Sequence, residues 1–442
     1  MGLHITVPKE THKHERRVAV SPETVKKLSA MDCVVSVESG AGLASDFTDD
    51  AYKDAGAKIV KDAAASLKTA DVVLKVQAPN AAELGAMKKG ALLVAMLGPF
   101  GNPSVLKDCA KAGVDAFSME FVPRISRAQA MDVLSSQSNL AGYKSVLDAA
   151  EHYAHAFPMM MTAAGTVPPA KVFVMGAGVA GLQAIATAKR LGAVVSATDV
   201  RPAAKEQVAS LGGSFVAVED EEFKQAETAG GYAKEMSADY KKKQADLVAS
   251  HIAKQDIVIT TALIPGRPSP KLISEAMVKS MKPGSVIVDM AVETGGNCEL
   301  SKAGEIVEVH GVKIIGHLNI PSRLAADASA LYAKNLFNLL GLVIDKEKKA
   351  LSIDWDDDII KGVAMTRDGA VVHPAFTGEK KETAVPKAEK AEKVPKTEKV
   401  EAKKDKAPEA EKDAAPKKVP VKKKAAKKPA KEKTETKTKK GA

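Results

Sequence analysis

The sequence predicts an α/β protein with two parallel sheets, followed by a tail that has no fold of its own. Short apolar runs alternate with helical patterns through residues 1–378, which is typical of parallel strands covered by helices. A glycine-rich turn after residue 175 begins a second set of such strands. After Gly378 the composition changes abruptly to Lys, Glu, Ala, Pro and Thr. We therefore expect two folded domains and one tail.

The glycine-rich turn lies in the stretch 171–201, KVFVMGAGVAGLQAIATAKRLGAVVSATDVR. An apolar run too short for a helix opens onto Gly176, Gly178 and Gly181, and a helix and a second strand follow. In such a βαβ unit the first glycine makes the turn and the second lets the backbone approach a pyrophosphate. The third glycine lets the helix pack on the strand. The pyrophosphate lies on the free N–H groups at the helix start, so the pattern predicts a Rossmann-like dinucleotide site.

The nucleotide is predicted to be NAD(H). Asp199 stands at the end of the second strand, 18 residues past Gly181. A carboxylate there accepts hydrogen bonds from the adenosine ribose hydroxyls and repels a 2′-phosphate, so NAD is favoured over NADP. Arg201 lies close by and weakens this preference only slightly.

The remaining elements follow from apolar runs and helix signals. A helix is expected to begin after Ser21, which caps it ahead of Pro22. Further helices are expected over residues 48–68 and 139–157, and a long one from about Ser322 that returns to the first domain. Strands are expected in the first domain at 4–8, 34–38, 71–76, 91–97 and 115–119, and in the second at 171–175, 194–198, 213–218, 256–260, 285–289 and, last, 313–316. The polar segment from Glu219 to Gln244 lacks a long apolar pattern and is expected to be a mobile loop.

These elements divide the chain into three parts. The first α/β domain is expected to be discontinuous, formed by residues 1–138 and 325–378. The Rossmann domain that binds NAD(H) is expected to span residues 139–324. Residues 379–442 are the Lys-rich tail.

The positive charge of the chain belongs to this tail. Residues 379–442 contain 23 Lys and 12 acidic residues, out of 65 Lys and Arg and 55 acidic residues in the whole chain. The remaining 42 basic and 43 acidic residues give residues 1–378 a net charge of −1. Nucleic-acid binding requires a basic surface, so no such function is expected of the folded part.

The tail is expected to be disordered, because it has no aromatic residue and too little apolar surface to offset the entropy of ordering. Three interpretations of its lysines remain open. The simplest is a solvated linker, which we prefer. The others are a polybasic segment at an anionic membrane surface and a contact with nucleic acid.

The chain is expected to be cytoplasmic. It has no apolar run of about 18 residues that would cross a membrane, and its N-terminus lacks the apolar core of a signal peptide. Cys33, Cys109 and Cys298 have neither the number nor the spacing of a disulfide set or a metal site, which suits a reducing compartment.

Three blocks of sequence carry a family signal beyond the generic fold. They are VPKETHKHERRVAVSPETV (7–25), FVPRISRAQAMDVLSSQSNLAGY (121–143) and the dinucleotide block. They resemble the superfamily of alanine dehydrogenases and proton-translocating transhydrogenases. The closer resemblance is to the NAD(H)-binding α chains of NAD(P) transhydrogenases, and it is extended by GGYAKEMS (230–237), TTALIPGRP (260–268), VDMAVETGGNCELS (288–301) and NIPSRLAADAS (319–329). It covers nearly all of residues 1–378 and none of the tail.

The resemblance implies that the loop between the domains contacts the nicotinamide end of the cofactor. Arg124 is expected to fix the carboxamide oxygen, and Asp132 and Ser135 to pair with the carboxamide and the ribose. Gln129 is the residue best placed to touch the partner nucleotide. We take Arg124, Gln129 and Asp132, together with Tyr232, as the residues closest to the reaction.

The resemblance also assigns the rest of the nucleotide site. Val179, Ala180 and Gly181 belong to the phosphate turn, and Asp199, Val200 and Arg201 to the adenosine ribose. Leu263 belongs to the wall at the strand ends. Gly231, Tyr232 and Gln244 are expected in the mobile segment, which in the family closes over bound nucleotide and excludes water.

Alanine dehydrogenase is the second interpretation that the resemblance offers. In that branch an arginine of an ExRVA motif holds the keto-acid carboxylate, and Arg17 matches it. The lysine and histidine that act at the substrate carbonyl are replaced here by Gln77 and Gly98. Reductive amination requires a proton donor beside that carbonyl, so this departure favours transhydrogenase. Arg17 is then expected to form a structural ion pair.

Transhydrogenase function implies partners. The resemblance implies a homodimer, docked on a separate β subunit that binds NADP(H), with membrane subunits that carry the proton. The chain is then expected at the inner membrane, held there through its partners. Direct hydride transfer requires no catalytic acid, base or metal from the protein. For the same reason a non-catalytic NAD-binding regulator remains a third interpretation.

Overall fold

The computed structural model describes residues 2–224, 236–264 and 266–377. These residues form an eight-stranded sheet, a seven-stranded sheet and two small two-stranded ribbons, with helices between the strands. Most neighbouring strands in the two large sheets are parallel. The expected α/β class is therefore confirmed. The expectations for Gly231, Tyr232 and the tail concern residues outside this description.

The first sheet has the strand order β19-β18-β6-β5-β4-β1-β2-β3. Its strands are parallel from β6 to β3, whereas β18 and β19 are antiparallel additions from late in the chain. The bounds are β1 His4–Val7, β2 Val34–Glu38, β3 Lys58–Val60, β4 Val72–Leu74, β5 Leu92–Ala95, β6 Asp115–Ser118, β18 Ala364–Arg367 and β19 Ala370–Val371.

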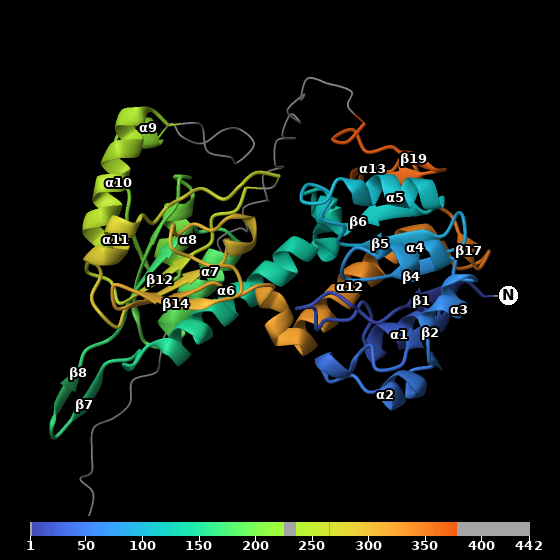
Figure 1. The fold of residues 1–442 in the computed structure, drawn as a ribbon, viewed down its shortest axis with the longest axis horizontal. Coiled ribbons are helices and arrows are strands. Elements are labelled where there is room, and N and C mark those ends of the chain that lie inside the picture. The colour runs from blue at the N-terminus through green and yellow to red at the C-terminus, as the bar shows by residue number, and fades with distance from the viewer. Residues whose placement is uncertain (1, 225–235, 265, 378–442) are drawn as a thin grey trace, which may run out of the picture. The chain divides into compact units, whose positions relative to one another are not determined.

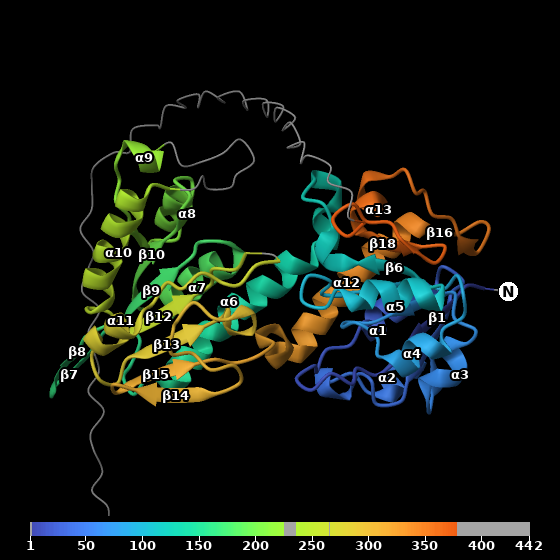
Figure 2. The same ribbon diagram turned by 45° about the horizontal axis from the view of Figure 1, so that its top comes forward.

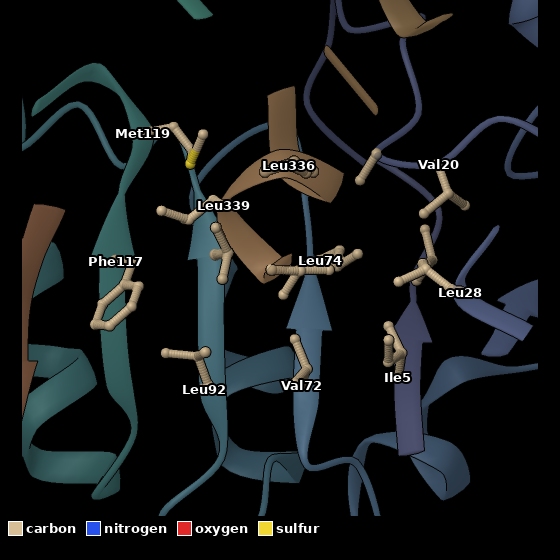
Figure 3. Packing of buried hydrophobic residues seen from close by; sticks show 14 of the residues in the cluster. Ile5, Val20, Leu28, Val72, Leu74, Leu92, Phe117, Met119, Leu336 and Leu339 are labelled. Carbon is tan, nitrogen blue, oxygen red and sulfur yellow. The ribbon is translucent and has the colours of Figure 1, made fainter. Parts of the chain in front are cut away.

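A buried apolar layer covers one face of this sheet. Helix α12 (Ala325–Val343) contributes Leu336 and Leu339, both fully buried, to the same cluster as Leu74 of β4 and Leu92 of β5. Figure 3 shows the two leucines of α12 over the side chains of β1, β4 and β5. The late helix therefore packs on the sheet formed by the first part of the chain, as expected.

The second sheet has the strand order β11-β10-β9-β12-β13-β15-β14, with the last six strands following one another in Figure 2. All pairs are parallel except β14 with β15. The order reverses between β9 and β12, which is where doubly wound sheets bind nucleotides. The bounds are β9 Lys171–Met175, β10 Val194–Thr198, β11 Ser214–Phe215, β12 Ile257–Thr260, β13 Val286–Asp289, β14 Ile306–Val309 and β15 Val312–Ile315.

The helices begin where capping residues predict. Ser21 and Asp132 cap α1 and α6 by accepting hydrogen bonds from backbone N–H groups of the first turn. The bounds of the helices other than α12 are α1 Pro22–Ser29, α2 Asp49–Asp54, α3 Ala63–Leu67, α4 Ala81–Ala86, α5 Ser104–Ala112, α6 Val133–His152, α7 Val179–Arg190, α8 Ala204–Ser210, α9 Glu221–Lys224, α10 Ala238–Ile252, α11 Glu275–Ser280 and α13 Asp358–Val363. Short 3₁₀ segments are η1 Leu43–Ser45, η2 Met119–Phe121, η3 Ser126–Met131, η4 Val292–Thr294 and η5 Ile320–Leu324.

Two long helices connect the elements that matter for the site. Helix α6 contacts α7, and it also contacts α12, which runs beside it in both ribbon views (Figures 1 and 2). Helix α6 begins at Val133, six residues before the expected start, because Asp132 rather than a later residue caps it. A single helix thus joins the loop at 121–132 to the glycine turn.

The expected single helix over residues 48–68 is wrong. The chain forms α2, the short strand β3 and α3 in that range. Gly56 adopts φ +100°, a conformation that ends α2, and Asp62 caps the start of α3. The β-branched pair Ile59 and Val60 between them joins the sheet edge beside β2.

Two β-hairpins were not expected. Strand β14 is an antiparallel edge beyond β15, so residues 313–316 are not the last strand. His310 (φ +53°) and Gly311 (φ +76°) form its two-residue turn with the positive φ angles that tight hairpins favour. The second hairpin pairs β7 (Met160–Thr162) with β8 (Gly165–Val167), and all its residues are exposed.

Candidate nucleotide-binding site

The glycine turn connects β9 to α7 at the point where the order of the second sheet reverses. Gly176 adopts φ +106°, and a Cβ atom there would collide with the Thr261 hydroxyl. That hydroxyl follows β12 and donates to the Gly176 carbonyl at 3.1 Å. Thr261 therefore fixes the turn from the neighbouring strand, a role that the sequence pattern did not indicate.

The start of α7 leaves backbone donors available to a ligand. Gly178 is the N-cap and provides no side-chain hydrogen bond, so the N–H groups of Val179, Ala180 and Gly181 have no capping partner on it. Val179 is 42% exposed. An added Cβ at Gly178 would meet no heavy atom within 4 Å, so there is open space beside the turn. This is the arrangement that binds a pyrophosphate.

Close packing holds the first turn of α7 in place. A Cβ atom at Gly181 would overlap the Gly176 carbonyl oxygen, so only glycine fits there. A Cβ atom at Gly142 of α6 would likewise overlap the Ala180 carbonyl oxygen. Gly142 is a further structural requirement of the site, and it is visible only once α6 and α7 are in contact.

The Asp199 carboxylate lies beside the glycine turn. It accepts a hydrogen bond from the Ala177 N–H at 2.7 Å and from the Arg201 N–H and Nε at 2.9 Å. Its side chain is 7% exposed, whereas that of Arg201 is 34% exposed. Val200 between them is 60% exposed. Asp199 is thus fixed at the strand end, with Arg201 as its ion-pair partner.

Gln244 does not lie in a loop. It belongs to α10, where its Oε1 accepts from the Val218 N–H at 2.8 Å and its Nε2 donates to the Thr198 hydroxyl at 3.1 Å. The expectation of a mobile segment reaching to Gln244 is therefore wrong, because α10 begins at Ala238. Gln244 ties α10 to the ends of β10 and β11.

A short apolar wall lies at the end of β12. Leu263 and Ile264 are 55% and 46% exposed. The preceding Ala262 is held by Asn297, whose amide accepts from the Ala262 N–H at 3.1 Å and donates to its carbonyl at 2.9 Å. Asp289 is likewise occupied, since it accepts from the Cys298 N–H and the Ser301 hydroxyl. Both buried polar residues are scaffold, as expected.

The loop residues at 124–135 fall into two groups. Arg124 and Gln129 are exposed side chains in the segment that precedes α6. Asp132 and Ser135 lie together, because Asp132 caps α6 by accepting from the Ser135 N–H at 2.9 Å and from its hydroxyl at 2.5 Å. The structure thus brings two of the four residues into contact.

Helix α6 sets the separation between this pair and the phosphate turn. Ser135 lies in its first turn, and Gly142 contacts Ala180 seven residues later. At a rise of 1.5 Å per residue the two positions are about 10 Å apart along the helix. One rigid element therefore carries both the Asp132–Ser135 pair and the contact to the glycine turn.

A separate buried cluster surrounds Arg17. Its guanidinium pairs with Glu15 at 2.7 Å and donates to Gln137 at 2.8 Å, while Gln77 donates to Glu15 at 2.7 Å. Burial alone would raise the pKa of Glu15, but the hydrogen bonds and charge of Arg17 outweigh it and lower that pKa to about 2. The expected structural ion pair of Arg17 is present. Gly98 offers only its backbone N–H, which donates to Glu120.

Comparison with protein families identifies this arrangement. The alanine dehydrogenase/PNT N-terminal domain matches residues 6–141, and the C-terminal domain of the same family matches residues 145–374. The chain belongs to the alanine dehydrogenase/PNT family. The two matches meet within α6, the helix that joins the loop to the glycine turn.

Members of this family resemble the chain over most of its length. It is 59% identical over 382 residues to an NAD(P) transhydrogenase subunit alpha chain of Rhodospirillum rubrum, covering 85% of this chain and 100% of that one. The crystal structure of transhydrogenase from Sinorhizobium meliloti is 56% identical with a TM-score of 0.77, over 84% of this chain and 100% of that one. An L-alanine dehydrogenase is 26% identical with a TM-score of 0.71, over 85% and 98%. The resemblance drawn from the sequence blocks is confirmed.

Proposed function

We propose that this chain is the NAD(H)-binding subunit of a proton-translocating NAD(P) transhydrogenase. The observation that carries the proposal is the 59% identity to a transhydrogenase subunit over that subunit's whole length. Hydride passes directly from NADH to NADP⁺ held on a partner subunit, so that NADH is oxidised and NADP⁺ is reduced. Membrane-spanning partner subunits move the proton.

The residues present fit a dinucleotide. The open space at Gly178 and the first-turn N–H groups of α7 accommodate a pyrophosphate. Asp199, fixed by Ala177 and Arg201, accepts from the adenosine ribose hydroxyls. Asp199 also disfavours a 2′-phosphate, which supports NAD(H) rather than NADP(H) on this chain.

The nicotinamide supplies the chemistry, and this chain supplies position. We assign Arg124, Gln129, Asp132 and Ser135 to the nicotinamide end, with Leu263 as part of the wall. Because hydride moves between two nicotinamides, the required contribution is to align two rings at close approach. Tyr232, outside the described residues, keeps its predicted place among the residues nearest the reaction, and Gly231 its place at the nucleotide.

Alanine dehydrogenase activity is the alternative that the family allows. It requires a proton donor at the substrate carbonyl. Gln77 is engaged with Glu15, and Gly98 has no side chain, so neither fills that role. We therefore expect no oxidation of NADH when the chain is given pyruvate and ammonium.

We further propose that the chain is a homodimer and that the β7–β8 hairpin forms part of the contact. Met159, Met160, Met161 and Val167 are 59%, 44%, 80% and 36% exposed. Exposed apolar side chains on an isolated two-stranded ribbon are typical of a surface that another chain covers.

The location follows from the partners. Within residues 2–224, 236–264 and 266–377, no helix is both long and apolar enough to span a membrane. We propose that the chain lies on the cytoplasmic side of the inner membrane and is held there by its partner subunits. The division into domains at 1–138 with 325–378 and at 139–324, and a contact of the tail with anionic lipid, remain predictions.

An add-back assay tests the proposed function. Membranes from cells that make this chain are stripped of it, and the purified chain is returned before NADPH and an NAD⁺ analogue are added. We expect transfer to depend on the returned chain. Tight NADH binding without restored transfer would instead indicate a regulator that binds NAD and does not transfer hydride.

A further inference from the structure

The segment that carries Gln129 is a weak structural element on its own. Residues 126–131 form the 3₁₀ segment η3, and 3₁₀ turns have poorer hydrogen-bond geometry than an α-helix. Ala128 and Met131 are buried beneath it, while Gln129 faces outward. The orientation of Gln129 and of the following Asp132 therefore depends on what holds η3 from below.

Two asparagines of α12 hold η3 by the same backbone atom. The side-chain Nδ2 of Asn335 donates to the Ala130 carbonyl at 2.8 Å, and that of Asn338 donates to the same oxygen at 2.9 Å. The two residues lie three positions apart and so share one face of the helix. Both lone pairs of the Ala130 carbonyl are thereby directed at α12.

Asn335 also reaches the first turn of α6. Its Oδ1 accepts from the Ser136 hydroxyl at 2.8 Å, and its side chain is 7% exposed. One buried amide thus connects η3 on one side of Asp132 to α6 on the other. A buried amide with both ends paired fixes geometry more strongly than an exposed one.

A surface ion pair adds little to this attachment. Arg127 of η3 pairs with Asp357 at 2.7 Å, but their side chains are 47% and 22% exposed. Exposed ion pairs contribute about 0 to 1 kcal/mol. The asparagines are therefore the principal attachment.

We propose that Asn335 and Asn338 are positioning residues that set the placement of Gln129 and Asp132 for hydride transfer. The proposal rests on the proposed function, since it takes these two residues to lie at the nicotinamide end. It adds that their geometry is set from α12, about 200 residues later in the chain. Transfer depends steeply on alignment, because small displacements of reacting groups have large effects on rate.

The test uses Asn338→Asp, which keeps the side chain's shape but places an acceptor against the Ala130 carbonyl. The chain is returned to stripped membranes, and transfer from NADPH to an NAD⁺ analogue is measured with NADH affinity. We expect kcat to fall about tenfold or more, with KM for the NAD⁺ analogue changed less than about threefold. Lys334→Gln is the matched control, because Lys334 lies on the same helix and pairs with Glu23 at the surface.

A double-mutant cycle separates positioning from general destabilisation. If Asn338 acts through Gln129, the loss caused by Asn338→Asp disappears when Gln129→Ala is already present. Additive losses in the two variants, or an unchanged kcat in Asn338→Asp, would overturn the proposal. Asn335→Asp, at the buried position, provides a second variant with the same expected split between kcat and KM.

The wild-type chain keeps this test distinct from that of the proposed function. If the wild-type chain restores no transfer, the proposed function fails, and the positioning role fails with it. If the wild-type chain restores transfer and Asn338→Asp matches it, only the positioning role fails. The dihydronicotinamide fluorescence of NADH bound to the isolated chain gives a second readout, which we expect to differ between wild type and Asn338→Asp.

Discussion

Gly142 of α6 lies against the carbonyl oxygen of Ala180 in the first turn of α7, with no room for a Cβ atom at residue 142. This contact fixes where the helix that carries Asp132 crosses the helix that receives the pyrophosphate. The geometry of both ends of the proposed nucleotide site therefore depends on one glycine that contacts no nucleotide in the proposal.

We predict that Gly142→Ala weakens both stability and NADH binding. The added methyl group forces α6 and α7 apart, and overpacking of this kind costs about 1 to 3 kcal/mol. Thermal unfolding and an NADH titration measure the two effects. Gly341→Ala in α12 is the control, since a Cβ atom there meets nothing within 4 Å. It should stabilise the chain by about 0.5 to 1 kcal/mol. Equal Tm values for the two variants would show that α6 and α7 are not in close contact.

Asp199→Ala should weaken NADH binding about tenfold to a hundredfold, because hydrogen bonds to a charged acceptor contribute about 1.5 to 3 kcal/mol. The same change removes the carboxylate with which Arg201 pairs. We therefore expect the preference for NADH over NADPH to shrink, since Arg201 then meets the 2′-phosphate. Titrations with both nucleotides measure this. Asp239→Ala, at an exposed surface pair of α10, is the control. An unchanged NADH dissociation constant would remove Asp199 from the ribose.

Asp132 has a structural role and a proposed functional role, and Asp132→Asn separates them. Asparagine caps a helix about as well as aspartate, so the Tm should stay close to that of the wild type. The charge beside the nicotinamide ribose is lost, and transfer in the add-back assay should fall about tenfold or more. Asp132→Ala should lose about 1 kcal/mol of stability in addition. If Asp132→Asn transfers hydride at the wild-type rate, Asp132 is only the cap of α6.

The Glu15–Arg17 pair predicts how stability responds to acid. The pKa of Glu15 is lowered from its ordinary value of 4.5 to about 2. A lowered carboxyl pKa means that the stabilisation is complete above about pH 4.5 and is lost as the pH falls toward 2. The loss amounts to about 3 kcal/mol. Glu15→Gln should therefore flatten the decline of unfolding free energy over that range, measured by urea denaturation. Glu23→Gln, at an exposed pair, should leave the decline nearly unchanged.

Met161→Lys tests the proposed homodimer. A charge on the 80% exposed tip residue of the β7–β8 hairpin should raise the dimer dissociation constant about tenfold or more, because burying a lysine in an apolar contact is costly. Analytical ultracentrifugation over a concentration series measures this. Ile306→Lys on the edge strand β14, where Ile306 is 43% exposed, is the control. Dimers of unchanged affinity in Met161→Lys would exclude the hairpin from the contact.

The elements that the sequence predicted well are those encoded by neighbouring residues. The turn at Gly176, the cap at Ser21 and the strand end at Asp199 each depend on a few adjacent residues, and each is present. The short strand β3 was missed because three residues give no periodic signal, and the hairpin at His310 because the turn lies between polar residues.

The supports of the candidate site were not predictable in the same way. Gly142 looks like any helical glycine until α7 packs on it, and Asn335 and Asn338 look like polar residues on a helix. Their partners lie about 40 and 200 residues away along the chain. Which groups meet at such separations is decided by tertiary packing, and a single sequence carries no local mark of it.

The most direct test of the account follows the hydride itself. The chain is returned to stripped membranes in ordinary water with NADP⁺ and NADH that carries deuterium at both positions of nicotinamide C4, and the NADPH formed is analysed by mass spectrometry. Direct transfer between two nicotinamides predicts one deuterium in each NADPH molecule formed. NADPH without deuterium would show that the hydrogen comes from solvent or a protein group, and would contradict the proposed function.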